Sequence, residues 1–79
     1  MHIIYSTTSS KEEALKISRI LVAEKIVACT NIIENMTSVY LWQENIEESS
    51  ESILIAKTSE ECVSATISRI KELHSYEIP

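Results

Sequence analysis

The chain has 79 residues and a formal net charge of −5, it contains no glycine, and all twelve of its acidic residues are glutamate. The lack of glycine excludes P-loops, dinucleotide-binding fingerprints and nucleophile elbows, because the turns in these motifs need positive φ or a close backbone approach. The acidic balance and the absence of a basic stripe argue against a nucleic-acid partner.

The first predicted elements are a short strand and an amphipathic helix. The β-branched and aromatic residues at 2–7 are typical of a strand. A capping box follows, formed by either Ser9 with Glu12 or Ser10 with Glu13, whose side chains accept hydrogen bonds from backbone N–H groups at a helix start. The apolar positions after it recur at spacings of three and four, which predicts one helical stripe. These positions are Ala14, Ile17, Ile20, Leu21 and, at the end, Ile26.

The rest of the chain predicts two strands and a second helix. Residues 27–42 are typical of one long strand with a bend or bulge near Asn35, because asparagine tolerates the left-handed helical region. A turn at 43–45 leads into a strand over 46–58, which is polar at first and then apolar. Residues 58–61 (Thr-Ser-Glu-Glu) have the sequence of a second capping box before another helical stripe. That stripe consists of Val63, Ile67 and Ile70.

The order strand–helix–strand–strand–helix predicts a single α+β domain over residues 1–79. It matches the ferredoxin-like βαββαβ layout, in which two helices cover one face of an antiparallel sheet. The final strand of that layout has no counterpart in the sequence, so we expect a domain truncated at its C-terminal end. A chain of this length buries only about 60–65% of its unfolded surface, and oligomerisation is therefore the expected source of additional stability.

The sequence predicts a cytoplasmic protein with reduced thiols. Its N-terminus lacks the charged region of a signal peptide, and no apolar run approaches the roughly 18 residues of a membrane span. The two cysteines, Cys29 and Cys62, lie far apart in the sequence and do not constitute a disulfide framework. We expect no membrane partner, and we expect both cysteines to pack as small apolar residues.

Few residues are suited to metal binding or catalysis, and none has the spacing of a dedicated metal site. His2 is expected to be an exposed terminal residue, whereas His74 follows the last apolar position of a helix, where an imidazolium would also suit the helix dipole. The chain offers no nucleophile–base–orienter set, so we do not expect an enzyme. Tyr40 and Trp42 lie on one face of a strand and suit either the core or a subunit interface.

Several segments form an ordered set along the whole chain. They are residues 21–32 (LVAEKIVACTNI), 37–43 (TSVYLWQ), 46–47 (IE), Glu51, 57–58 (KT) and 74–79 (HSYEIP). Together they resemble the "AEKLAAC", "TSxYxW", "E…KT" and "HPYxxP" signatures of the CutA-type divalent-cation-tolerance proteins. Each segment alone is a weak signal, but the ordered set is specific.

The resemblance implies a ferredoxin-like subunit that forms a homotrimer through its sheet edges, with a divalent metal, chiefly copper (Cu²⁺), as candidate ligand. It places the family's metal-implicated cysteine at Ser6 and its pair of histidines at Leu73 and His74, so that His74 is one good ligand and Ser6 a weak one. The family's loop glycines are replaced by Asn35 and Glu44. The candidate interface or pocket residues are Tyr40, Trp42, Glu51, Lys57 and Tyr76.

Three functional hypotheses follow. The first is a trimeric, non-enzymatic protein that binds metal ions weakly, or that signals or acts as a scaffold in response to them, by analogy with PII-type trimers. The second is a small enzyme whose active site lies in a subunit cleft, with His74 as general acid or base. The third is a purely structural trimer that serves as a platform for partners.

Overall fold

The computed structural model describes residues 1–74 and confirms the predicted order of strands and helices. Its elements are β1 (His2–Thr8), α1 (Lys11–Ala23), β2 (Cys29–Trp42), β3 (Asn45–Thr58), the 3₁₀ helix η1 (Glu60–Cys62) and α2 (Val63–Leu73).

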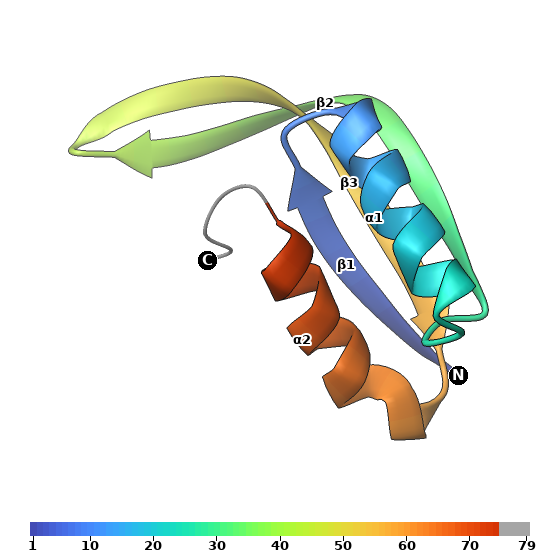
Figure 1. The fold of residues 1–79 in the computed structure, drawn as a ribbon. Coiled ribbons are helices and arrows are strands. Elements are labelled where there is room, and N and C mark those ends of the chain that lie inside the picture. Colours follow the sequence, from blue (N-terminus) through green and yellow to red (C-terminus); the bar gives the residue numbers. More distant parts are fainter. Residues whose placement is uncertain (75–79) are drawn as a thin grey trace.

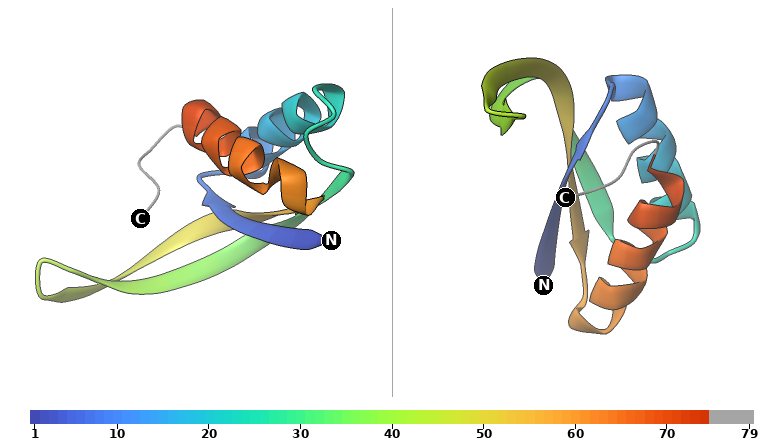
Figure 2. Two further views of the ribbon diagram at one scale, coloured as in Figure 1. Left: turned by 90° about the horizontal axis from the view of Figure 1, so that it is seen from below. Right: turned by 90° about the vertical axis from the view of Figure 1, so that its left-hand side faces the viewer.

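The strands form an antiparallel sheet in the order β1–β3–β2, and both helices cover the same face of it (Figures 1 and 2). This is the α+β, ferredoxin-like arrangement that the sequence predicts. Within residues 1–74, β1 and β2 are the two edge strands, and no further strand follows α2. Each edge therefore presents a row of backbone N–H and C=O groups that can pair with another strand.

The core lies between the sheet and the helices. The buried apolar side chains are Ala14, Ile17, Leu21, Val27, Leu54, Ala56 and Ile70. The predicted stripe of the first helix is thus confirmed in its centre, whereas Ile20 and Ile26 are only half-buried. In α2 the prediction is partly wrong, because Ile67 is 40% exposed. Ile67 lines a pocket beside β1, the edge strand whose outer side no element among residues 1–74 covers.

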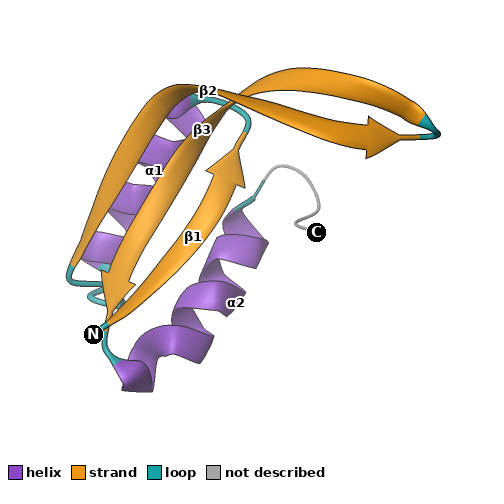
Figure 3. Ribbon diagram, turned by 180° about the vertical axis from the view of Figure 1, so that it is seen from behind, coloured by secondary structure: helices purple, strands orange, loops and turns teal. Residues whose placement is uncertain are grey.

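Figure 3 shows the face of the sheet that points away from the helices. The side chains on this face are also mainly apolar. Side chains alternate along each strand, and the register places one residue from each strand side by side across this face. The apolar members are Ile3, Tyr5, Ile33, Ile53 and Ile55. Ile3 and Tyr5 are 66% and 60% exposed, so this face is an unburied apolar surface in a single subunit.

The distal halves of β2 and β3 form a hairpin that projects from the body (Figure 1). Since β1 ends at Thr8 opposite Ser52, residues 36–51 pair only with each other, and we call them the projecting hairpin. The predicted bend is confirmed: the register shifts between Ile33 and Met36, and Asn35 has a φ of 56°. The hairpin exposes large apolar side chains, namely Val39, Tyr40, Leu41, Trp42 and Ile46.

The start of α1 follows one of the two predicted capping boxes. Ser10 is the N-cap residue, and its hydroxyl accepts a hydrogen bond from the backbone N–H of Glu13 at 3.1 Å. In a capping box the Glu13 carboxylate would accept from the backbone N–H of the N-cap residue, Ser10. Here it accepts instead from the backbone N–H of the preceding residue, Ser9, at 2.9 Å. The bond from the Glu13 N–H satisfies one of the backbone donors that the first turn of a helix leaves without partners, and the bond from Ser9 fixes the residue before the N-cap.

The predicted second capping box is wrong. The Thr58 hydroxyl donates to the carbonyl oxygen of Ile26 at 2.7 Å, and Ser59 makes no side-chain capping bond. The chain forms the short 3₁₀ helix η1 before α2 begins. The Thr58 hydroxyl thus forms a tertiary hydrogen bond between β3 and the segment after α1, in place of a local capping bond.

On the outer side, an ion pair joins the end of α1 to α2. Arg69 donates two hydrogen bonds to the Glu24 carboxylate, at 2.8 and 2.9 Å. The hydrogen bonds from Arg69 hold the pKa of the Glu24 carboxyl below its usual value, although partial desolvation opposes the shift. A carboxylate with a lowered pKa stabilises the fold at neutral pH and loses this contribution as the pH falls.

The end of α1 is a Schellman motif without glycine. The N–H of Ile26 donates to the carbonyl oxygen of Leu21, and that of Lys25 donates to the carbonyl oxygen of Val22. Lys25 occupies the left-handed position of the motif with a φ of 60°. Its Cβ makes this conformation unfavourable, since glycine is the residue usually found there.

Replacing Lys25 with glycine is expected to stabilise the protein by about 1 kcal/mol, because the strain at positive φ is removed. Urea-induced unfolding measures the change. Lys25→Ala is the matched control: it also removes the charge but keeps a Cβ, and should change the free energy of unfolding by less than about 0.5 kcal/mol. Equal stabilities for the two variants would contradict this account of the helix end.

Candidate functional site

The structure brings Ser6 and His74 together at one backbone carbonyl group. Ser6 lies on β1 opposite Leu54 and points toward the helices, where it is buried. Its hydroxyl donates to the carbonyl oxygen of Thr7 at 3.4 Å. His74 is the C-cap residue of α2, and its Nε2 contacts the same Thr7 oxygen at 2.5 Å. Two positions at opposite ends of the chain thus meet where the resemblance predicts a metal site.

The chemistry of these donors fits a metal ion only in part. Because a carbonyl oxygen is an acceptor, Nε2 of His74 must carry a proton in this contact. Metal ligation would have to use Nδ1, which is buried. The Ser6 hydroxyl is a poor ligand for copper, and Leu73 offers no donor atom. Among residues 1–74, no cluster of three or more histidine, cysteine or acidic side chains is placed to hold a metal ion.

The other predicted residues are spread along β2 and β3. Tyr40 and Glu51 line one pocket at the base of the projecting hairpin, together with Ser9, Ser49 and Ser50. Trp42 lies at the hairpin tip and is 60% exposed, so packing in the core of its own subunit is excluded. Lys57 is half-buried on the open face, between Ile3 and Cys29. Tyr76, and also Glu77, lie outside the described residues.

These positions do not form a single cleft within one subunit. Tyr40 pairs with Glu47, and Lys57 lies ten residues further along β3, which corresponds to roughly 33 Å of strand. His74 lies on the helix-covered side, whereas Lys57 lies on the open face. A cleft that combines these residues would therefore need more than one copy, and the enzyme hypothesis places its active site at such a subunit interface.

Sequence reasoning missed two features of the surface. Cys29, expected in the core, is exposed on the open face next to Lys57. Its strand register decides this, because Thr30 and Ile32 take the inward positions opposite Ala56 and Leu54. A groove between α1 and β2 was also not predicted. The signal available for it was Ser18, a polar residue inside the apolar stripe of the first helix.

Comparison with known proteins decides the family. The family model described as "CutA1 divalent ion tolerance protein" matches residues 2–79. The chain belongs to the CutA1 family. A relative named divalent-cation tolerance protein CutA, from Thermus thermophilus, is 36% identical over 77 residues, which cover 98% of this chain and 75% of the relative. A crystal structure of CutA1 from Ehrlichia chaffeensis has a TM-score of 0.91 and 38% identity, and the match covers 98% of this chain and 75% of that one.

A plant relative of this CutA1-family chain is longer. The rice protein named "Protein CutA 1, chloroplastic" is 32% identical over 77 residues, which are 98% of this chain but only 44% of the relative. Its name places that protein in the chloroplast, so the predicted cytoplasmic location is not confirmed. Among residues 1–74, neither helix has the length and apolar character needed to cross a membrane.

The CutA1 resemblance assigned two glycine positions of the family to Asn35 and Glu44, and both have positive φ, of 56° and 68°. The predicted three-residue turn is shorter in the structure, because Asn45 already pairs with Trp42. Gln43 and Glu44, both at positive φ, form a two-residue turn of the kind that matches strand twist in hairpins. This chain thus forms both of these positive-φ positions without glycine.

Proposed function

We propose that this CutA1-family chain is a homotrimeric, non-enzymatic protein of divalent-cation tolerance, acting in the cytoplasm as a binding or signalling scaffold. The observation that carries the proposal is the projecting hairpin, whose large apolar side chains are exposed on both of its faces in a single subunit. Monomeric soluble proteins rarely expose so many neighbouring apolar groups.

Three surfaces support assembly. Besides the projecting hairpin, the open face of the sheet exposes Ile3 and Tyr5, and β1 and β2 each present a strand edge. Contacts that join these two unlike edges would be head-to-tail, and they close into a ring when the rotation between copies permits it. The family resemblance favours a ring of three. Burial of these surfaces would provide the stability that a domain of this size lacks alone.

Light scattering of the purified chain tests this assembly. We expect a mass three times the 8.9 kDa of one chain, with dissociation on dilution accompanied by loss of structure. A folded monomer that persists at micromolar concentration would contradict the proposal. A stable dimer would contradict the ring of three while leaving the role of the apolar surfaces intact.

The divalent-cation part of the proposal rests on His74. Its ring is the one imidazole near the family's metal position, and Ser6 beside it contributes at most a weak contact. Ligation through Nδ1 requires the buried ring to turn or the end of α2 to move. We therefore propose weak binding of Cu²⁺ carried mainly by His74, a contact that would supply sensing of the ion rather than tight storage.

Calorimetric titration of the assembled protein with Cu²⁺ tests this contact. We expect weak uptake that declines as the pH falls, because a protonated imidazole cannot ligate a metal. His74→Ala should remove most of the uptake, while Cys29→Ser and Cys62→Ser should leave it nearly unchanged. Circular dichroism shows whether the His74 variant remains folded. Sub-micromolar affinity that survives in a folded His74→Ala variant would place the metal site elsewhere.

A further inference from the structure

A groove of about 540 Å³ runs between α1 and the edge strand β2. Its walls are mainly apolar, with the aliphatic side chains of Leu15 and Val22 on the helix side and Ile32 on the strand side. Val22 is 45% exposed, so its side chain is available to a partner at this groove. Arg19 lies at the groove with an exposed side chain. The groove thus combines an apolar interior with one positive charge.

Ser18 gives the groove a specific hydrogen-bonding requirement. It lines the groove and is only 5% exposed, yet its hydroxyl oxygen has no hydrogen-bond partner among residues 1–74. Native proteins rarely retain a buried hydroxyl in this condition, because its desolvation is not compensated. The oxygen is closed to solvent in a single subunit, so the side chain must turn toward the groove before a polar group that enters from outside can supply the missing partner.

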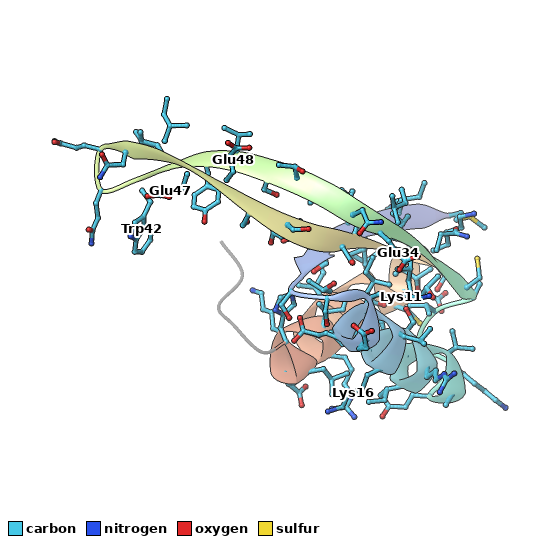
Figure 4. The ribbon with its side chains drawn as sticks, turned by 90° about the horizontal axis from the view of Figure 1, so that it is seen from above. Lys11, Lys16, Glu34, Trp42, Glu47 and Glu48 are labelled. Atoms are coloured by element: carbon cyan, nitrogen blue, oxygen red, sulfur yellow. The ribbon has the colours of Figure 1, made fainter. Side chains whose placement is uncertain are left out.

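The tip of the projecting hairpin has the complementary chemistry. Residues 36–51 contain four glutamates and no lysine or arginine. The register places Trp42 and Glu47 on one face of the hairpin and Glu48 on the other, and Figure 4 shows the same arrangement. Trp42 is 60% exposed and offers a large apolar ring with one N–H donor.

We propose that Trp42 of one copy seats in the α1–β2 groove of the next copy. The indole ring covers the apolar walls, its N–H donates to the Ser18 hydroxyl oxygen, and Glu47 faces Arg19. This inference rests on the proposed assembly and names the contact that would hold it together. The occupant is a second copy rather than a small molecule, because one face of the hairpin supplies the aromatic ring, the donor and the opposite charge in a single segment.

The contact joins two unlike surfaces, a hairpin tip and a groove, so every copy both donates a hairpin and receives one. Such a head-to-tail contact closes into a ring when the rotation between copies permits it. The hairpin extends away from the body that carries the groove, and the described residues span 40 Å along their longest axis (Figure 1). A hairpin of this reach meets another subunit rather than its own.

Charge reversal tests the contact on the intact chain. Arg19→Glu and Glu47→Lys should each raise the midpoint concentration for subunit dissociation at least about tenfold, since each puts like charges opposite one another. The double variant restores opposite charges and should return to within about threefold of the unmodified chain. Glu48→Lys is the matched control on the other hairpin face and should change the midpoint by less than about threefold.

Two further readouts report on the groove itself. Trp42 is the only tryptophan, so its fluorescence emission should shift to shorter wavelength on assembly and return on dilution. Ser18→Ala should raise the dissociation midpoint, because the indole N–H loses its acceptor. If the groove receives no partner, the same substitution removes an uncompensated hydroxyl and should leave the midpoint unchanged or lower it.

The outcomes separate this inference from the proposed assembly. A monomer in light scattering contradicts both. A trimer in which Trp42 emission does not respond to dilution, or in which Arg19→Glu and Glu47→Lys behave like Glu48→Lys, contradicts the inference alone and leaves the assembly standing. A double variant that is as weak as the sum of its two single changes also overturns the pairing of Glu47 with Arg19.

Discussion

Trp42→Ala is expected to destabilise the assembled protein by about 3 kcal/mol or more, because a large aromatic ring is lost from a subunit contact. The side chain is 60% exposed in one subunit, so the loss should appear as dissociation of subunits and not as weaker packing of the individual fold. Sedimentation or light scattering over a dilution series measures this effect, and circular dichroism follows the fold of each species.

Trp42→Phe is the control for this variant. It keeps an aromatic ring but removes the N–H donor, so we expect an intermediate loss of assembly. Leu41→Ala removes an even more exposed apolar side chain from the opposite hairpin face. If Trp42→Ala stays fully assembled with an unchanged melting temperature, Trp42 is peripheral, and the interface hypothesis for it is wrong.

Leu54→Ala is expected to lower the free energy of unfolding of the subunit by about 2–5 kcal/mol, since it leaves a cavity in a packed core. Leu54 is fully buried at the centre of β3, where Ser6 and Ile32 flank it in the register and both helices cover that face. For a domain of this size the loss is comparable with the total stability. Urea unfolding at a fixed protein concentration measures it.

Ile53→Ala is the matched control, because Ile53 is the next residue of the same strand and lies on the open face. We expect Ile53→Ala to act through assembly, so that its effect depends strongly on protein concentration. Leu54→Ala should retain most of its effect when the concentration is varied. Equal, concentration-independent losses for the two variants would show that the open face is buried within the subunit.

Much of the fold could be predicted from local patterns. The spacing of Ala14, Ile17 and Leu21 defined the buried side of α1, and Ser10 marked its start. Asn35 marked the bend in β2, since its side chain tolerates positive φ. These signals are local, because each depends on a few neighbouring residues. The second capping box failed for the opposite reason: Thr58 bonds to Ile26, which is distant in the sequence.

The candidate site was less predictable, because it depends on contacts between distant segments. Family resemblance aligned Ser6 and His74 with metal positions, but the spacing of the sequence gave no sign that both would contact the Thr7 carbonyl. Cys29 was expected in the core because its neighbours are apolar, yet the register with Lys57 places it on the open face. A shift of one residue would reverse this, and pairing register cannot be derived from one strand alone.

The length of the projecting hairpin also has a consequence for how the chain folds. Contacts within residues 36–51 are local and can form early, whereas α1 and β2 separate β1 from β3 in the sequence, so the pairing of β1 with β3 is expected to form later. Until it does, β3 has an unpaired edge beside exposed aromatic and aliphatic side chains, which favours aggregation. Glu47 and Glu48 stand in adjacent positions on the two faces of that strand. Their charges oppose stacking of one nascent hairpin on another. Glu47, which is proposed to direct assembly, therefore also helps to protect the chain before it has folded.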